Sequence, residues 1–201
     1  MLINPQSINK ARRELLKCEF LGPIVKQHTK CSINPEEQAP FDALISAIIG
    51  QQLSVKAAAT IDGRVRTLVG KTYRPTTILK FDHQALRACG LSNRKVEYVQ
   101  GIAEAVKSRK LNFKKLENAS NQEVMGKLVE LRGVGQWTAE MFMIFSLGRI
   151  DIFSPLDVGL QRGMRMLFGE QLTDLKHMEE LAERWRPYRS IASWYLWKLV
   201  D

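Results

Sequence analysis

Apolar residues recur every three or four positions along most of this chain, a spacing that places them on one face of an α-helix. Alternating apolar and polar residues, which would predict strands, are missing at useful length. The pattern therefore predicts an all-α protein. The clearest expected helices span residues 8–20, 41–49, 55–68, 93–108, 121–130, 136–147, 178–185 and 190–199, with a short helix between 75 and 89.

Capping residues, glycine and proline mark the ends of these helices. Ser54 and Ser92 each stand directly before a periodic apolar stretch, as N-cap residues do. The stretch Ser120–Glu123 has capping-box spacing. We expect the Gly22-Pro23 pair to close the first helix, and Pro155 to open the helix that follows residue 150.

Composition narrows the class of partner. The chain has 201 residues, of which 45% are hydrophobic, enough to bury a core within one domain or two small lobes. Its 30 Lys and Arg residues exceed its 21 Asp and Glu residues and give a net charge of +9, which favours a polyanionic partner such as nucleic acid. A basic enzyme without such a partner would carry a similar charge.

The beginning of the chain and its cysteines indicate an intracellular protein. Charged residues occur within the first ten positions, and no apolar run resembles a signal peptide or a membrane span. Cys18, Cys31 and Cys89 are odd in number and far apart, so they predict neither a disulfide framework nor a paired metal motif. His28 and Cys31 alone do not make a zinc site.

The segment 131–135, Leu-Arg-Gly-Val-Gly, joins two expected helices and predicts a tight turn. Backbone N–H groups of Gly135, Gln136 and Trp137 would begin the second helix and could bind one phosphate oxygen. Such a contact positions DNA without reading its sequence. For an isolated Gly-x-Gly, a helical connector without a ligand is the alternative.

Asp157 lies 20 residues beyond Trp137, after an expected helix and a short connector that could fold it back over the open end of the hairpin. Residues 131–157 resemble the signature of base-excision DNA glycosylases, and the family's Gly/Pro-Asp pattern falls on Pro155–Asp157, which makes Asp157 the candidate catalytic carboxylate. Cleavage of an N-glycosidic bond builds positive charge on the sugar, which a fixed carboxylate stabilises more than it stabilises the neutral ground state. The same group can orient the attacking water. Ser154–Asp157 is also an ordinary helix start, and a capping role is compatible with the catalytic one.

Residues 131–157 resemble the helix-hairpin-helix and Gly/Pro-Asp signature of base-excision DNA glycosylases. Within that superfamily, LRGVGQWTAE and DIFSPLDVGLQRG resemble the alkylpurine branch, the 3-methyladenine DNA glycosylase II type. The resemblance extends from about residue 40 to 197 through IIGQQLSVKAAATI, CGLSNRKVEYVQGIAEAV and RWRPYRSIASWYLW, in the family's order.

The resemblance implies a single domain over residues 1–201, with two helical lobes and the active site in the cleft between them. Lobe A would span about 36–149, and lobe B about 1–35 plus 150–201. It also implies that the target base is flipped out of the duplex before it is cut.

The resemblance assigns roles to further residues. The Gln52 side chain would fill the gap that the extruded base leaves in the base stack, with Leu53 beside it and Ser54 near the minor groove. The alternative is that Gln51 and Gln52 only separate two helices. The expected base-pocket residues are Trp137, Trp197 and Met141. The two tryptophans could equally be core residues. Met141 occupies a position at which relatives have a tyrosine. The hairpin residues expected at phosphate are Gly133, Gly135, Gln136 and Trp137. Four basic residues are candidate phosphate neighbours, although each of them alone is more typical of an ordinary solvated charge: Lys56, Lys95, Arg132 and Arg162.

Two departures from other branches bear on chemistry and cofactors. Lyase enzymes of the superfamily place a Schiff-base lysine where this chain has Trp137, so no strand cleavage is expected. Iron-sulfur variants need four C-terminal cysteines, and none follows Cys89, so no cluster is expected. No cofactor should be required. A structural Na⁺ or K⁺ ion at the hairpin is possible by resemblance, held by the backbone carbonyls of Val129, Leu131 and Val134.

The sequence thus predicts a monofunctional DNA glycosylase that removes alkylated purines of the 3-methyladenine and 7-methylguanine type from double-stranded DNA in base excision repair. It would act as a monomer that does not bind a membrane, in the cytoplasm or nucleoid of a prokaryote or the nucleus of a eukaryote. One alternative is a catalytically silent protein that binds damage, and another is a glycosylase for uracil or ethenoadenine. A protein-interaction bundle would leave the ordered motifs unexplained.

Overall fold

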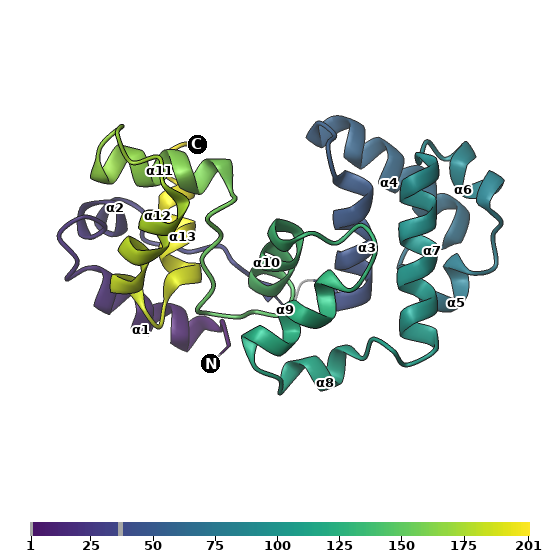
Figure 1. Ribbon diagram of the computed structural model, residues 1–201, viewed down its shortest axis with the longest axis horizontal. Coiled ribbons are helices and arrows are strands. Elements are labelled where there is room, and N and C mark those ends of the chain that lie inside the picture. Colours follow the sequence, from purple (N-terminus) through teal and green to yellow (C-terminus); the bar gives the residue numbers. More distant parts are fainter. Residues whose placement is uncertain (1, 36–37) are drawn as a thin grey trace. The chain divides into compact units, whose positions relative to one another are not determined.

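The computed structural model describes residues 2–35 and 38–201, and the regular structure of these residues is helical (Figure 1). One isolated antiparallel bridge joins Leu2 and Arg149. This confirms the predicted all-α class. Within the described ranges, no helix combines the length and the apolar character needed to cross a lipid bilayer.

The described chain forms two compact units. The central unit is Gln38–Phe142, and the terminal unit joins residues 2–35 to Met143–Asp201. The central unit ends at Phe142, within a helix, whereas the sequence predicted that the corresponding lobe would end at about residue 149. The predicted first residue of that lobe, residue 36, lies outside the described residues.

The central unit begins with the expected core helix and ends in α10. Its helices are α3 (Pro40–Gly50), α4 (Val55–Val69), α5 (Pro75–Ile78), α6 (His83–Ala88), α7 (Asn93–Lys107), α8 (Phe113–Glu117), α9 (Asn121–Val129) and most of α10 (Gln136–Phe145). Ser54, Ser92 and Ser120 each cap the helix that the sequence predicted, and the capping box at Ser120 is present.

Two features of the central unit differ from expectation. The segment before Cys89 forms two helices, because the Asp82 side chain accepts a hydrogen bond from the Ala85 N–H and starts α6 anew. Helix α8 was not predicted, and Asn112 caps it in the same way, through the Lys115 N–H.

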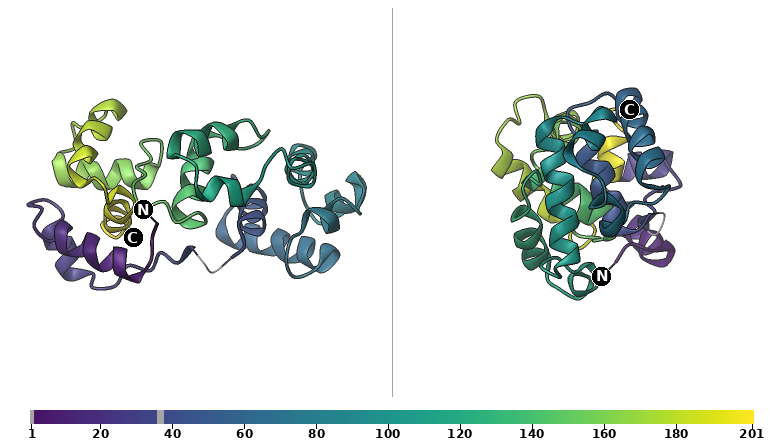
Figure 2. Two further views of the ribbon diagram at one scale, coloured as in Figure 1. Left: turned by 90° about the horizontal axis from the view of Figure 1, so that it is seen from below. Right: turned by 90° about the vertical axis from the view of Figure 1, so that its right-hand side faces the viewer.

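The terminal unit brings the two ends of the chain together. Its helices are α1 (Pro5–Leu15), α2 (Gly22–Gln27), α11 (Val158–Phe168), α12 (Leu175–Ala182), the 3₁₀ helix η2 (Glu183–Trp185) and α13 (Arg189–Trp197). Helix α1 packs against α13, and Figure 2 shows these first and last segments side by side. Residues 190–196 of α13 are all buried, so this helix forms the centre of the unit.

Three boundaries in the terminal unit correct the sequence interpretation. The first helix begins at Pro5, because Asn4 and Ser7 form a capping box ahead of it, and it ends at Leu15. Gly22-Pro23 opens α2 rather than closing α1, since proline fits the first helical turn. Helix α11 begins at Val158, not at Pro155, because Asp157 is its N-cap.

A charged network joins α3 to α4 in the central unit. Asp42 is only 5% exposed and accepts a hydrogen bond of 2.9 Å from the Arg66 guanidinium. Arg66 also donates to Asp62 at 2.6 Å and to the Ser46 hydroxyl at 2.8 Å. The Tyr73 hydroxyl donates to the Asp62 carboxylate, and burial together with Asp62 raises the pKa of Tyr73. Arg66 therefore neutralises two carboxylates that lie between the helices.

We predict that Arg66→Leu lowers the free energy of unfolding by about 2–3 kcal/mol, because it leaves the buried Asp42 carboxylate without its cation. The matched control is Lys127→Ala, which removes an exposed ion pair to Glu130 and should cost less than about 0.5 kcal/mol. Urea denaturation of both variants measures the difference. Equal, small losses would contradict a stabilising role for the network.

Candidate active site and nucleic-acid interface

The hairpin between α9 and α10 has the tight geometry that its sequence predicted. The Val134 N–H donates to the Leu131 carbonyl at 3.0 Å, and the Gly135 carbonyl accepts the first helical bond of α10 from Ala139. Gly133 adopts φ +91°, and a Cβ atom there would lie 2.3 Å from the Tyr98 ring. Only glycine fits this position, since both the backbone conformation and the space exclude a side chain.

The start of α10 is open to solvent. Gly135 and Gln136 are exposed, and N–H groups in the first turn of a helix have no acceptor within the helix. The positive end of the helix dipole adds to this potential. The geometry suits an anionic oxygen, such as that of a phosphate group.

Gln51 ties this hairpin to the turn that follows α3. Its side-chain amide donates to the Gly133 carbonyl at 2.9 Å and to the Thr138 hydroxyl at 3.1 Å. The Lys95 ammonium donates to the carbonyls of Ile49 and Gln51, at 2.6 and 2.7 Å, and burial lowers the pKa of Lys95. The sequence predicted Lys95 near a phosphate group of DNA. In the structure its ammonium group lies at the carboxyl end of α3.

The turn held in this way presents its next residues outward. Gln52 is exposed and has a left-handed backbone with φ +57°, which is uncommon for a residue with a side chain. Leu53 is 38% exposed, and the Ser54 hydroxyl caps α4 by accepting the Ala57 N–H. A strained, exposed position next to a rigid support is typical of a functional site.

A surface hollow of about 550 Å³ lies in the central unit between the hairpin and this turn. Gln52, Gly133 and Gly135 line it, together with the basic residues Arg94 and Arg132. The Arg132 guanidinium lies 3.3 Å from the Glu97 carboxylate, but both side chains are largely exposed. The hollow therefore combines hairpin backbone with positive charge, as a DNA backbone requires.

Trp137 and Met141 lie one turn apart on α10 and so share a face of that helix. Trp137 is 43% exposed and Met141 is half-buried. Phe145, which sequence reasoning missed, belongs to the terminal unit, where its ring lies 5.5 Å from the Trp197 ring, centroid to centroid. Its position could have been found by continuing the four-residue spacing from Trp137.

Asp157 lies in the terminal unit, at the start of α11. Its Oδ1 atom accepts two hydrogen bonds, from the Leu160 N–H at 2.9 Å and from the Trp197 indole N–H at 2.8 Å. The predicted catalytic carboxylate and the predicted pocket residue Trp197 are therefore brought into direct contact. Asp157 is therefore the N-cap of α11, and this role restrains its carboxylate.

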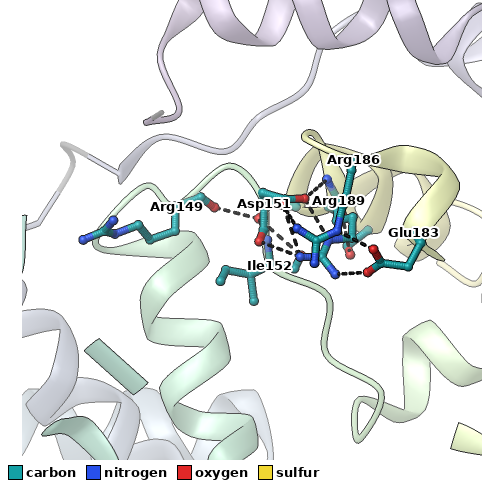
Figure 3. A network of polar contacts seen from close by, with 8 residues as sticks. Arg149, Asp151, Ile152, Glu183, Arg186 and Arg189 are labelled. Atoms are coloured by element: carbon teal, nitrogen blue, oxygen red, sulfur yellow. Dashed lines mark hydrogen bonds and ion pairs between the residues drawn. The ribbon is translucent and has the colours of Figure 1, made fainter. Parts of the chain in front are cut away.

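The connector that carries Asp157 is anchored to the start of α13 (Figure 3). The buried Ser190 hydroxyl donates to the Arg149 carbonyl at 2.6 Å and accepts the Ile152 N–H at 3.0 Å. The Arg189 guanidinium donates to both oxygens of Asp151, at 2.7 and 3.1 Å. Figure 3 shows Glu183 on the far side of Arg189, where it accepts a further bond of 2.7 Å. These contacts set the path of the chain just before Asp157.

Comparison with known proteins shows the family of this chain. The family profile described as "HhH-GPD superfamily base excision DNA repair protein" matches residues 45–187, which is more than half of the chain and includes both the hairpin and Asp157. The chain belongs to this superfamily.

Individual HhH-GPD relatives carry related names. DNA-3-methyladenine glycosylase 1 of Schizosaccharomyces pombe is 37% identical over 171 residues, covering 81% of this chain and 73% of the relative. A DNA-3-methyladenine glycosidase structure from Bacillus halodurans has a TM-score of 0.87 at 40% identity, covering 95% of this chain and 89% of that one. The S. pombe 3-methyladenine DNA glycosylase in complex with abasic DNA has a TM-score of 0.80 at 32% identity, covering 94% and 95%.

We predict that Gln51→Ala destabilises this HhH-GPD protein by about 1–3 kcal/mol, because the Gly133 carbonyl and the buried Thr138 hydroxyl lose a donor. The neighbouring Gln52→Ala variant is the matched control. Its side chain is exposed, so the free energy of unfolding should change by less than about 0.5 kcal/mol. Chemical denaturation of the two variants in parallel makes the comparison, and equal effects would show that Gln51 does not support the hairpin.

Proposed function

We propose that this chain is a monofunctional DNA glycosylase that flips alkylated purines, of the 3-methyladenine and 7-methylguanine type, out of duplex DNA and releases them by hydrolysis in base excision repair. The observation that carries the proposal is the Asp157 carboxylate, fixed by two N–H donors in a chain of the HhH-GPD superfamily. Relatives named as 3-methyladenine glycosylases support the substrate class.

The proposed reaction breaks the bond between the sugar C1′ and the purine nitrogen, and the bonding electrons leave with the base. Alkylation makes the purine cationic, so it departs as a neutral molecule and needs little acid assistance. Positive charge then develops on the sugar, and Asp157 stabilises it electrostatically. Water adds to C1′ and loses a proton, with Asp157 orienting the attacking molecule.

The remaining site residues would hold the DNA and the extruded base. Hairpin N–H groups would bind a phosphate, and Gln52 with Leu53 would fill the vacated stack, since unstacking a base costs a few kcal/mol. Ser54 would lie near the minor groove. The base contacts would come from Trp137, Met141 and Trp197, because an electron-rich ring attracts a cationic purine. We propose that a monomer suffices, acting wherever the cell keeps its DNA.

No cofactor enters the proposed chemistry. Carbonyl oxygens are suitable ligands for Na⁺ or K⁺, and α9 ends at Val129, where the last carbonyls of a helix lack intrahelical donors. Val129, Leu131 and Val134 would hold such an ion, which would strengthen the grip on phosphate and take no part in bond cleavage. The Leu131 carbonyl already accepts the Val134 N–H and would use its second lone pair.

The decisive prediction concerns Asp157→Asn. An amide keeps the size of the side chain but carries no negative charge, so base release should fall at least about a hundredfold. The measurement incubates wild type and variant with methylated duplex DNA and quantifies free 3-methyladenine and 7-methylguanine by chromatography. Equal release from both proteins would remove the mechanism.

The same assay separates the alternatives. A silent damage-binding protein would bind abasic duplex in a salt-dependent manner without releasing any base. A glycosylase of other specificity would release uracil or ethenoadenine from matched duplexes and spare the methylated purines.

A further prediction is that the product strand stays intact. Trp137 offers no amine, so no Schiff base should form there, and borohydride should trap no covalent enzyme–DNA complex. Denaturing gels should show nicked strands only after the product abasic site is treated with alkali. Nicking by the enzyme alone, together with borohydride trapping, would show that another amine in the chain acts as a lyase.

A further inference from the structure

Trp197 contacts the catalytic carboxylate through its edge. The last residue of α13, it donates its indole N–H to Asp157 Oδ1 at 2.8 Å. The Leu160 N–H of α11 donates to the same oxygen at 2.9 Å. Two helices thus converge on one carboxylate oxygen, with donors that are part of rigid groups.

Gly159 provides the space for this contact. A Cβ atom at position 159 would lie 3.0 Å from Trp197 Cδ1, 3.3 Å from Trp197 Nε1 and 3.1 Å from Asp157 Oδ1. Such distances are closer than most side-chain contacts, so a methyl group would push the indole or the carboxylate away by a few tenths of an ångström. The bare backbone at Gly159 allows the indole edge to reach Asp157.

Other contacts fix the indole in this orientation. The Phe145 ring lies 5.5 Å from the Trp197 ring, centroid to centroid, with an interplanar angle of 31°. At the other end of α13, Ser190 and Arg189 bind the connector that leads to Asp157. Helix α13 therefore holds this segment of chain at both of its ends.

We propose that Trp197 is a positioning residue that orients the Asp157 carboxylate through its indole N–H, and that Gly159 is required for this contact. The inference rests on the proposed function. This role is separate from the base contact proposed for the same residue, because a base contact uses the face of the Trp197 ring, whereas the positioning role uses its N–H group.

The first test compares four variants by single-turnover base release from methylated duplex DNA. Trp197→Phe keeps an aromatic ring and removes the N–H, and Gly159→Ala keeps the indole and crowds it. Each should lower the maximal rate by about ten- to a hundredfold, the value of one hydrogen bond to a charged group. The enzyme concentration at half-maximal rate should stay unchanged, because ground-state binding is not the affected step.

Two control variants change the same residue types elsewhere. The first control is Trp194→Phe. Trp194 lies on the same helix as Trp197, but its indole N–H donates to the Ser32 hydroxyl. Gly126→Ala lies inside α9, where an added Cβ meets nothing within 4 Å. Both should release base at the wild-type rate. Alanine is a better helix former than glycine, so Gly159→Ala should also remain folded, as circular dichroism can verify.

The second test measures binding and does not require turnover. Two duplexes carry a pyrrolidine abasic analogue, whose ring nitrogen is protonated and mimics the cationic sugar, or a neutral tetrahydrofuran analogue. Wild type should prefer the cationic duplex, and Trp197→Phe should reduce that preference about tenfold or more. A Trp197→Phe variant that prefers the cationic duplex as strongly as wild type does would overturn the inference.

The outcomes separate the inference from the function on which it rests. Release by wild type but not by Asp157→Asn, with Trp197→Phe and Gly159→Ala both at the wild-type rate, would remove the inference alone. No release by wild type, with no preference between the two analogues, would remove the proposed function as well.

Discussion

The proposed chemistry depends on the Asp157 carboxylate, and two N–H groups restrain one of its oxygens. A carboxylate stabilises a developing cation only if it is already in place when charge appears, since reorienting it would cost part of the stabilisation. Capping α11 supplies one restraint, and the Trp197 indole supplies the second. The same aspartate is thus both a helix cap and the proposed catalytic group, and the structural role serves the chemical one.

The central unit carries the residues that we propose for the DNA itself, namely the hairpin for a phosphate group and Gln52 for the gap in the base stack. Gln51 links the two parts, because its amide bonds to the hairpin while the adjacent Gln52 faces outward with a left-handed backbone. The Lys95 ammonium donates hydrogen bonds to two carbonyls at the end of α3 and so stabilises the turn. A strained residue persists only where its surroundings restrain it, and these contacts provide that restraint.

Much of the helical fold could be predicted from the sequence. Apolar periodicity and serine caps located α3, α4, α7, α9 and α10 to within a few residues, because those helices obey local rules. Predictions were wrong where a short polar side chain started a helix in an unexpected place, as Asp82 and Asp157 do. The motif identified Asp157 and Trp197 separately, but their hydrogen bond spans 40 residues and depends on the burial of α13. Gln51, Lys95 and Gly159 act through such tertiary contacts, which no local pattern reveals.

The most direct test of the account is a crystal structure of the protein bound to duplex DNA that carries the pyrrolidine abasic analogue. The account predicts the cationic ring nitrogen at about 3 Å from an Asp157 carboxylate oxygen, with the Trp197 N–H still bonded to that group. A structure in which the Asp157 carboxylate points into the interior of the terminal unit, out of reach of the extruded sugar, would contradict it.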